Sequence, residues 1–205
     1  MADSIAIDPH KWFYVPIEAG CALFKDLKYS KAAFSHIPDY LAADKDLDDR
    51  LDYNEHGVQL SRGFKSLKIW MTFKAYGAKR LKEAIEHDIK KAQYLKIKIE
   101  QSEYFQVTAE GPLSVLCYRF NPAKLDLDEQ IPEEADILES INHRLLTDIE
   151  KDGRVFITGT RVHGKTSLRS CFVNHRTQKY HLDKIVSVLE ELAENICKTI
   201  TLNMV

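Results

Sequence analysis

Residues 2–12 read Ala2-Asp3-Ser4-Ile5-Ala6-Ile7-Asp8-Pro9-His10-Lys11-Trp12, and the fold of the chain follows from this stretch. Its apolar-rich run ends at Asp8-Pro9, because proline has no backbone N–H to donate and restricts the residue before it. The pattern predicts a strand from Ser4 to Asp8, with Lys11 on the turn beyond it. Loops at strand ends are where a rigid scaffold presents reactive groups.

Lys11 is therefore a candidate for covalent chemistry. A lysine amine is a poor nucleophile while protonated, but desolvation or a nearby positive charge can free it to form a Schiff base with a carbonyl. The alternative is an ordinary surface lysine, since most Lys and Arg side chains of a soluble protein are solvated. A His-Lys pair alone does not decide between the two.

Two blocks of sequence carry a family resemblance. The first is residues 2–12 with its continuation Gly20-Cys21-Ala22-Leu23, and the second is Leu60-Ser61-Arg62-Gly63-Phe64-Lys65-Ser66-Leu67-Lys68-Ile69-Trp70. Together, and with this spacing, they resemble the pyridoxal 5'-phosphate (PLP)-dependent group II amino acid decarboxylases, with the aromatic L-amino acid decarboxylases as the nearest branch. The resemblance covers essentially the whole chain and corresponds to the C-terminal part of such an enzyme.

This resemblance implies an α/β fold, the C-terminal part of a fold-type I PLP-dependent transferase-like enzyme. Residues 1–76 are expected to be the end of the large PLP-binding domain with a catalytic loop, and residues 77–205 the small C-terminal α+β domain. In the family, the acidic residue at the pyridine nitrogen, the group that stacks on the ring and the phosphate-binding loop all precede the lysine segment. We therefore expect a fragment, a truncated product or half of a split enzyme.

The resemblance also implies roles for the first block. Lys11 corresponds to the lysine that forms the Schiff base with PLP, and His10 to a histidine on the phosphate side of the cofactor. The alternative for His10 is a structural histidine that bonds to backbone. Some relatives have asparagine in place of Asp8, and an aspartate would bring like charge near the phosphate. We therefore interpret Asp8 as a residue that orients the turn.

Tyr53 falls where the family has a tyrosine on a mobile catalytic loop. That tyrosine is thought to deliver a proton to the substrate Cα after CO₂ leaves, a step that needs an acid on the correct face with water excluded. In the family, phenylalanine at this position is associated with aldehyde-forming chemistry, so a tyrosine favours simple decarboxylation. The alternative is an ordinary loop tyrosine.

Arg62 and His56 are candidates for positioning the substrate or the loop. Arg62 matches an arginine of the second block and could pair with an acidic group. Gly63 departs from the family, because many relatives have a second arginine there, and this puts an anchoring role of the pair in doubt. His56 could contact substrate, although the sequence favours a solvated histidine. Trp70 also matches the family, but its helical spacing favours a core position.

The rest of the chain predicts alternating elements. Residues 20–25 are expected to form a second strand that, like the first, is buried on both faces of a sheet, and residues 26–60 a long polar connection or active-site lid. Ser61 is expected to cap a helix over residues 62–76, which Gly77 separates from a second helix. A sheet of about four strands covered by helices on one side should follow. The helices are expected at 78–101, 132–152 and 180–202, and the strands at 104–109, 114–120, 154–158 and 166–173.

Composition narrows the function classes. A net charge of −2 gives no reason to expect a nucleic-acid or anionic-membrane partner. No apolar stretch approaches the roughly 20 residues that span a bilayer, and the start of the chain predicts no signal peptide. The four cysteines form no C-x-x-C pair, which predicts buried free thiols, no metal site and a cytoplasmic location.

The resemblance thus implies PLP-dependent decarboxylation of an L-amino acid, an aromatic one in the nearest branch, to the amine and CO₂. The resemblance also implies a homodimer with the active site at the interface, and a possible separate N-terminal half. The alternative is a non-catalytic truncated fragment that acts only in assembly or dimerisation.

Overall fold

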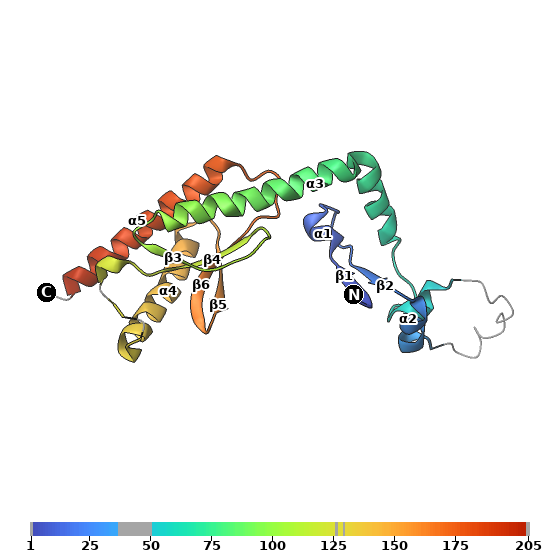
Figure 1. The fold of residues 1–205 in the computed structure, drawn as a ribbon, viewed down its shortest axis with the longest axis horizontal. Helices are drawn as coiled ribbons and strands as arrows, with labels where there is room; N and C mark the ends of the chain where they lie inside the picture. Colours follow the sequence, from blue (N-terminus) through green and yellow to red (C-terminus); the bar gives the residue numbers. More distant parts are fainter. Residues whose placement is uncertain (1, 37–50, 126, 129, 204–205) are drawn as a thin grey trace. The chain divides into compact units, whose positions relative to one another are not determined.

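The computed structural model of the chain describes residues 2–36, 51–125, 127–128 and 130–203. The chain divides into two compact units, Met1–Leu81 and Lys82–Val205. Figure 1 draws the first in blue to green and the second in green to red. Their assignment to a large cofactor domain and a small domain stays a prediction.

The first unit begins with two short strands. β1 (Ser4–Ile7) pairs antiparallel with β2 (Cys21–Phe24), and between them Pro9 opens the single helical turn α1 (Pro9–Trp12). Proline suits this first position, because its fixed φ is helical and its missing N–H costs no bond there. The expected strands are present, but their apolar side chains are half exposed rather than buried on both faces. Among the described residues, each of these strands has only the other as its sheet neighbour.

The region expected to be a polar connection contains two helical elements. Asp26 caps α2 (Leu27–Phe34) by accepting a hydrogen bond from the backbone N–H of Lys28 at 2.9 Å. Further on, η2 (Tyr53–His56) is a 3₁₀ turn. These two helical segments of the connection were not predicted; α2 starts at a side-chain cap, and its apolar periodicity is weak. The acidic part of the predicted lid, in residues 37–50, lies outside the described residues.

α3 (Lys65–Glu100) contains both predicted helices. Gly77 interrupts it with φ 76° and ψ 154°, a conformation that non-glycine residues adopt only with strain. The predicted break at Gly77 is confirmed. The helix begins at Lys65 rather than Arg62, so Ser61 is too far upstream to be its N-cap.

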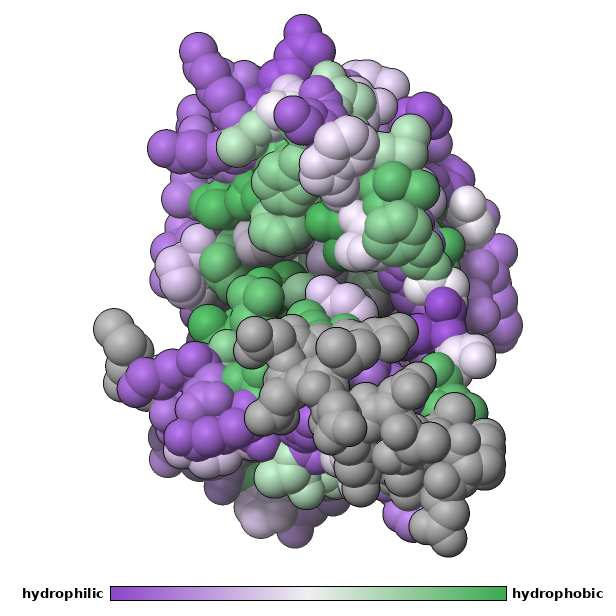
Figure 2. Space-filling model, turned by 90° about the vertical axis from the view of Figure 1, so that its right-hand side faces the viewer, coloured by the Kyte–Doolittle hydropathy of each residue, from purple (hydrophilic) through white to green (hydrophobic). Residues whose placement is uncertain are grey.

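The apolar stripe at the start of α3 faces outward. Phe64, Leu67, Trp70 and Met71 are all exposed, and Trp70 is 58% exposed, so the prediction of a core position for Trp70 is wrong. On another face, Phe73 packs edge-to-face against Phe13 with ring centroids 5.5 Å apart. Figure 2, which views the molecule from the right-hand side of Figure 1, shows apolar side chains at the surface. The amphipathic pattern predicted the helix correctly, but periodicity does not say whether the apolar face is covered.

The second unit is an antiparallel sheet of four strands with the order β3-β4-β6-β5. Its elements in chain order are β3 (Phe105–Glu110), β4 (Val115–Phe120), η3 (Ala123–Leu125), α4 (Pro132–Asp152), β5 (Thr158–Val162), β6 (Lys165–Cys171) and α5 (Lys179–Asn203). Gly153 ends α4 in a left-handed conformation, and its N–H bonds to the carbonyl of Ile149. The strand expected over 154–158 begins only at Thr158, because Arg154 folds back on Asp152 through backbone and side-chain bonds.

One core holds the second unit together. The inward residues of the sheet pack with the second half of α3, α4 and α5, as predicted for a sheet covered by helices on one side. Asn142 of α4 is fully buried, and its amide bonds to both the N–H and the carbonyl of Phe120 at 2.9 and 3.0 Å. The side chain thereby extends the hydrogen bonding of the sheet into the helix layer. The fully buried large side chains are Leu95, Ile99, Leu116, Tyr118, Phe120, Leu138, Asn142, Leu145, Ile149, Leu168, Leu182 and Leu189.

The cysteines are free, as predicted, but not all are buried. Cys117 and Cys197 lie in the interior, Cys21 is half-buried and Cys171 is exposed. Burial raises the pKa of the Cys117 thiol, which suits a structural rather than a reactive role. Among the helices that the structure describes, none is long and apolar enough to cross a membrane.

Candidate functional site

The first candidate cluster is the lysine turn, made of Asp8, His10 and Lys11. Nζ of Lys11 donates to Oδ2 of Asp8 at 2.6 Å, and both side chains are largely exposed. The backbone N–H of Lys11 also donates to the Asp8 carbonyl at 2.9 Å. The hydrogen bond and charge of Lys11 lower the pKa of Asp8. An ionised Asp8 therefore orients an accessible primary amine at the end of β1.

His10 fastens this turn to the connection that follows it. Its Nδ1 lies 2.9 Å from the carbonyl oxygen and 3.3 Å from the backbone nitrogen of Ala19, which is fully buried. These contacts of the ring involve Nδ1, and Nε2 is the atom that could meet a ligand. The structural role considered for His10 is present in this geometry, and it leaves room for a second role at Nε2.

An ion pair joins the same connection to α3. Nζ of Lys65 lies 2.5 Å from Oε1 of Glu18, and this hydrogen bond together with the charge of Lys65 lowers the pKa of Glu18. Glu18 and Lys65 were not predicted as interacting residues. The sequence gives little signal for this pair, because Glu18 and Lys65 are residues of common types that lie 47 positions apart.

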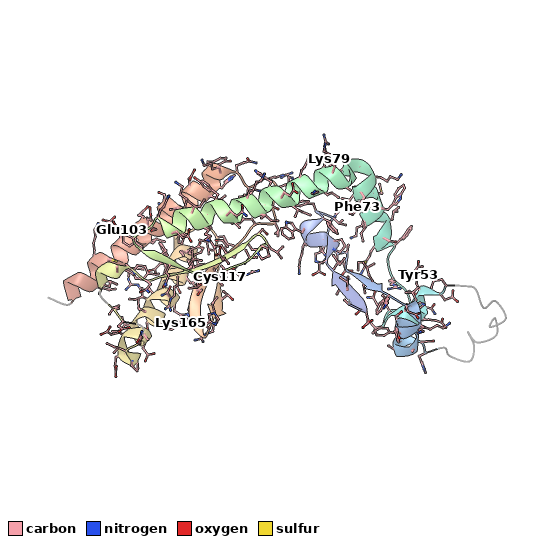
Figure 3. The ribbon with its side chains drawn as sticks, in the orientation of Figure 1. Tyr53, Phe73, Lys79, Glu103, Cys117 and Lys165 are labelled. Carbon is pink, nitrogen blue, oxygen red and sulfur yellow. The ribbon has the colours of Figure 1, made fainter. Side chains whose placement is uncertain are left out.

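The second candidate cluster is the tyrosine turn, made of Tyr53, His56 and Arg62. Nη2 of Arg62 donates to the carbonyl oxygen of Tyr53 at 2.7 Å, and the guanidinium lies 5.9 Å from the centre of the Tyr53 ring. Figure 3 labels Tyr53 at the start of η2, where its side chain is 66% exposed. Two residues that were predicted separately are thus in direct contact.

His56 is held rather than solvated. Its Nδ1 lies 2.7 Å from Oγ of Ser30, which is 1% exposed on α2. The neighbouring Glu55 is buried and forms an ion pair with Lys31 at 2.7 Å. The hydrogen bond from Lys31 lowers the pKa of Glu55 and outweighs the opposing effect of burial. The expectation of a solvated His56 is wrong, because α2 supplies partners that the sequence did not reveal.

A cavity of about 570 Å³ adjoins the tyrosine turn. Tyr53, His56 and Arg62 line it together with an apolar wall that includes Phe24, Leu27, Phe64 and Ile69. Asp8, His10 and Lys11 are not among the lining residues. The structure therefore places the six predicted residues in two clusters, three in each.

Ser30, Lys31 and Glu55 are the residues of this region that sequence reasoning missed. The available signal was Asp26, a good helix cap, followed by Leu27 and Phe34 at helical spacing. A helix here would have brought Ser30 and Lys31 onto neighbouring faces of one element. Among the residues that the structure describes, no group of histidine, cysteine or carboxylate side chains could hold a metal ion.

Comparison with known proteins identifies a family model for the first part of the chain. Residues 1–121 match the model described as the pyridoxal-dependent decarboxylase conserved domain. An aromatic-L-amino-acid decarboxylase of Bacillus atrophaeus is 28% identical over 196 residues, which are 95% of this chain and 39% of that protein. A phenylacetaldehyde synthase of Petunia hybrida is 29% identical over 193 residues, which are 94% of this chain and 38% of that protein.

A solved structure shares the fold. The structure of Oryza sativa TDC with PLP and tryptamine superposes with a TM-score of 0.84 at 22% identity, over 95% of this chain and 39% of that chain. The similarity confirms the predicted fold class, because the match covers 95% of this chain and its mixture of helices and strands fits part of an α/β fold. The chain spans about 39% of the length of these relatives.

Proposed function

Because the chain belongs to the pyridoxal-dependent decarboxylase family, we propose that it is the part of a PLP-dependent carboxy-lyase that carries the Schiff-base lysine. The proposed reaction converts an L-amino acid, an aromatic one by its relatives, to the amine and CO₂. The observation that carries the proposal is the lysine turn, where Asp8 orients the exposed amine of Lys11 at the end of β1.

The side chains of Lys11 and His10 fit the aldehyde and the phosphate of the cofactor. A primary amine reached by solvent is what an aldehyde requires, and a histidine with Nε2 to spare suits a phosphate. Bound PLP supplies that aldehyde and a ring that delocalises the electron pair left when CO₂ departs. Lys11 would hold the cofactor covalently, and His10 would contact its phosphate side.

The lysine turn is proposed to orient the amine of Lys11 before any reaction. The ammonium of Lys11 must lose a proton to become a nucleophile, and Asp8 holds that ammonium in a fixed position through a 2.6 Å bond. His10 keeps the turn in place through Ala19. Asp8 is therefore proposed to orient the amine, while His10 supports the backbone beneath it.

Tyr53 is proposed to donate its phenolic proton to the substrate Cα after CO₂ leaves. Arg62 positions the residue by binding its carbonyl oxygen and by lying near its ring. The apolar wall of the adjoining cavity would limit access of water to the proton. His56 belongs to the same turn and is proposed to position the substrate or the turn.

Partners are proposed on the same basis. The cavity that Tyr53 lines does not include Lys11, so the two clusters need not serve one site within one copy of the chain. A homodimer with the active site at the interface would bring Lys11 and Tyr53 from two copies to one site. A separate N-terminal half is the other proposed partner, and it would supply the cofactor-binding groups that precede the lysine segment in the family. The free thiols support a cytoplasmic location.

The proposal is tested by labelling Lys11. The chain is incubated with PLP, both alone and together with the preceding part of the protein. The adduct is reduced with borohydride, and the labelled lysine is identified by peptide mass spectrometry. We expect the adduct on Lys11 and its loss in Lys11→Ala. Lys28→Ala is the matched control, because Lys28 is similarly exposed and pairs with Asp26 at 2.8 Å. Equal labelling of Lys11→Ala and the unaltered chain would refute the assignment.

The same preparations are then screened for products. Amine release from L-tryptophan, L-tyrosine or L-DOPA supports decarboxylation, and aldehyde with hydrogen peroxide supports the activity named for the Petunia relative. If Lys11 is labelled but no substrate is turned over by any preparation, the non-catalytic role in assembly or dimerisation is the better account. Sedimentation of the chain would then measure dimer formation directly.

A further inference from the structure

We infer that Ser30 fixes the tautomer of His56, with the proton on Nδ1, and that this bond positions the turn that carries Tyr53. The inference deepens the proposed function and rests on it only for the role of Tyr53. It concerns two residues, Ser30 and His56, that lie 26 positions apart and meet at 2.7 Å in the described structure.

The single hydroxyl hydrogen of Ser30 already has an acceptor. Oγ of Ser30 donates to the carbonyl oxygen of Leu27 at 2.9 Å, one turn earlier in α2. A serine hydroxyl has one hydrogen to donate and two lone pairs that accept. With that hydrogen engaged, Oγ can only accept from Nδ1 of His56. The imidazole therefore carries its proton on Nδ1, and in the neutral ring Nε2 is a hydrogen-bond acceptor.

The burial of Ser30 favours this direction of the hydrogen bonds over the reverse one. Ser30 is 1% exposed, so water cannot easily replace either partner of its hydroxyl group. Reversing the hydrogen bond to His56 would require Ser30 to give up the Leu27 carbonyl. The contact with Ser30 therefore selects the Nδ1–H form of His56, whereas a solvated ring exchanges freely between its two tautomers.

A second contact fastens the same turn to the same helix. Glu55, the neighbour of His56, forms an ion pair with Lys31, the neighbour of Ser30, and also accepts a hydrogen bond from Ser35 at 3.4 Å. Two consecutive residues of η2 thus bind two consecutive residues of α2. The element has little freedom to rotate while both contacts persist.

The 3₁₀ geometry transmits this constraint to Tyr53. In a helix with three residues per turn, side chains at positions i and i+3 lie on one side. Tyr53 and His56 have this spacing in η2, and both line the cavity. Fixing the His56 ring on α2 therefore sets the side of the turn on which Tyr53 is presented. Ser30 and His56 are positioning residues in this scheme.

The test reads the tautomer directly. Imidazole ¹⁵N shifts of His56, assigned with His56→Gln and recorded at a pH where the ring is neutral, distinguish Nδ1–H from Nε2–H. We expect Nδ1–H in the unaltered chain and loss of this preference in Ser30→Ala. Ser187→Ala, which removes an exposed serine of α5, is the control. An Nε2–H form in the unaltered chain, or an unchanged Nδ1–H form in Ser30→Ala, would overturn the inference.

A variant pair covers the case in which Ser30→Ala does not fold. The amide N–H₂ of asparagine stands close to where Nδ1 stands in histidine, and that of glutamine close to Nε2. His56→Asn should keep hydrogen exchange of the η2 amides near the unaltered rate, whereas His56→Gln should raise it about fivefold to tenfold, as for one lost hydrogen bond. Equal exchange in both variants contradicts the inference. Neither readout depends on turnover, so failure of the proposed activity is a separate result.

Discussion

At the scale of single residues, the two clusters differ in what holds them. Lys11 is exposed and its orienting partner Asp8 is three positions away, so the amine is set by local geometry alone. Tyr53 is exposed as well, but its backbone is held by Arg62 and its turn by contacts with α2. The lysine turn could therefore be predicted from one stretch of sequence, whereas the supports of Tyr53 required the folded chain.

The role of Tyr53 gives the first prediction. Tyr53→Phe should leave PLP labelling of Lys11 intact and lower the rate of amine formation by about 10²-fold or more, because a general acid is lost. When the proton is no longer delivered, O₂ can take the electron pair instead, and product should shift toward the aldehyde, with ammonia and hydrogen peroxide formed alongside it. Single-turnover kinetics with product analysis on the complete enzyme would measure both effects.

Tyr40→Phe is the matched comparison for this prediction, because Tyr40 belongs to the same stretch between the two sequence blocks and lies outside the described residues. Loss of amine formation in Tyr40→Phe, with Tyr53→Phe fully active, would transfer the acid role away from Tyr53. The substitution at Tyr53 keeps the ring, so its contact with Arg62 should persist and the turn should stay folded.

A buried ion pair gives the second prediction. Lys91 donates to Asp88 at 2.7 Å and to the carbonyl of Asn174 at 3.0 Å, and both charged side chains are almost fully buried. Lys91→Met should lower the free energy of unfolding by about 3–5 kcal/mol, because Asp88 keeps a buried charge without this partner. Urea denaturation measures the change.

An exposed pair on the same helix is the control for Lys91. Lys82 and Glu86 lie 3.7 Å apart with exposed side chains, so Lys82→Met should cost no more than about 0.5 kcal/mol. The double variant Asp88→Asn with Lys91→Met should recover part of the loss, since it also removes the buried negative charge. Equal losses of unfolding free energy in Lys91→Met and Lys82→Met would contradict the prediction, because the buried pair would then stabilise the fold no more than the exposed pair.

At the scale of elements, sequence reasoning succeeded where a local rule dominates. Gly77 and Gly153 both adopt positive φ; Gly77 lies at the predicted break, and Gly153 directly follows the predicted end of the helix over 132–152. Pro132 opens α4 with two acidic residues in its first turn, as the helix-start rules predict. The failures have tertiary causes: Arg154 binds Asp152 and Glu191, which keeps its segment out of the sheet until Thr158.

Glu139 of α4 links three elements and gives the third prediction. It accepts hydrogen bonds from the backbone and hydroxyl of Thr166 on β6 at 2.8 and 2.6 Å, and from Arg161 on β5 at 3.2 Å. Burial alone would raise the pKa of Glu139, but these bonds and the nearby arginines lower it. The carboxylate therefore favours the folded state while it is ionised.

The pH dependence follows from that direction. The contribution of Glu139 is fully present above the ordinary glutamate pKa of about 4.3, and it is lost as the pH falls through the lowered folded value. The stability difference between the unaltered chain and Glu139→Gln should therefore be largest near neutral pH and shrink in acid. Thr166→Val, which keeps the carboxylate but removes one donor, should show a smaller effect. A difference independent of pH would contradict this account.

At the scale of the whole molecule, the two units differ in how far their apolar residues are buried. The second unit has one continuous core, whereas the first exposes Phe64, Trp70 and Met71 and the outer residues of its two strands. The fold class and the small α+β unit could be predicted because their periodicity reflects burial within the unit. The exposure of Trp70 could not, because one helix face looks the same in sequence whether or not something covers it.

This asymmetry gives the last prediction. Residues 82–205 expressed alone should unfold cooperatively and stay monomeric in light scattering, since their core is self-contained. The full chain should bind a hydrophobic dye and self-associate, because exposed apolar stripes and strand edges promote association. Replacing Trp70 and Met71 by lysine should reduce both signals while leaving the circular dichroism of the helices unchanged. A full chain that is monodisperse and binds no dye would contradict this prediction. The apolar face of α3 would then be covered within a single chain, and the exposure of Trp70 and Met71 would be wrong.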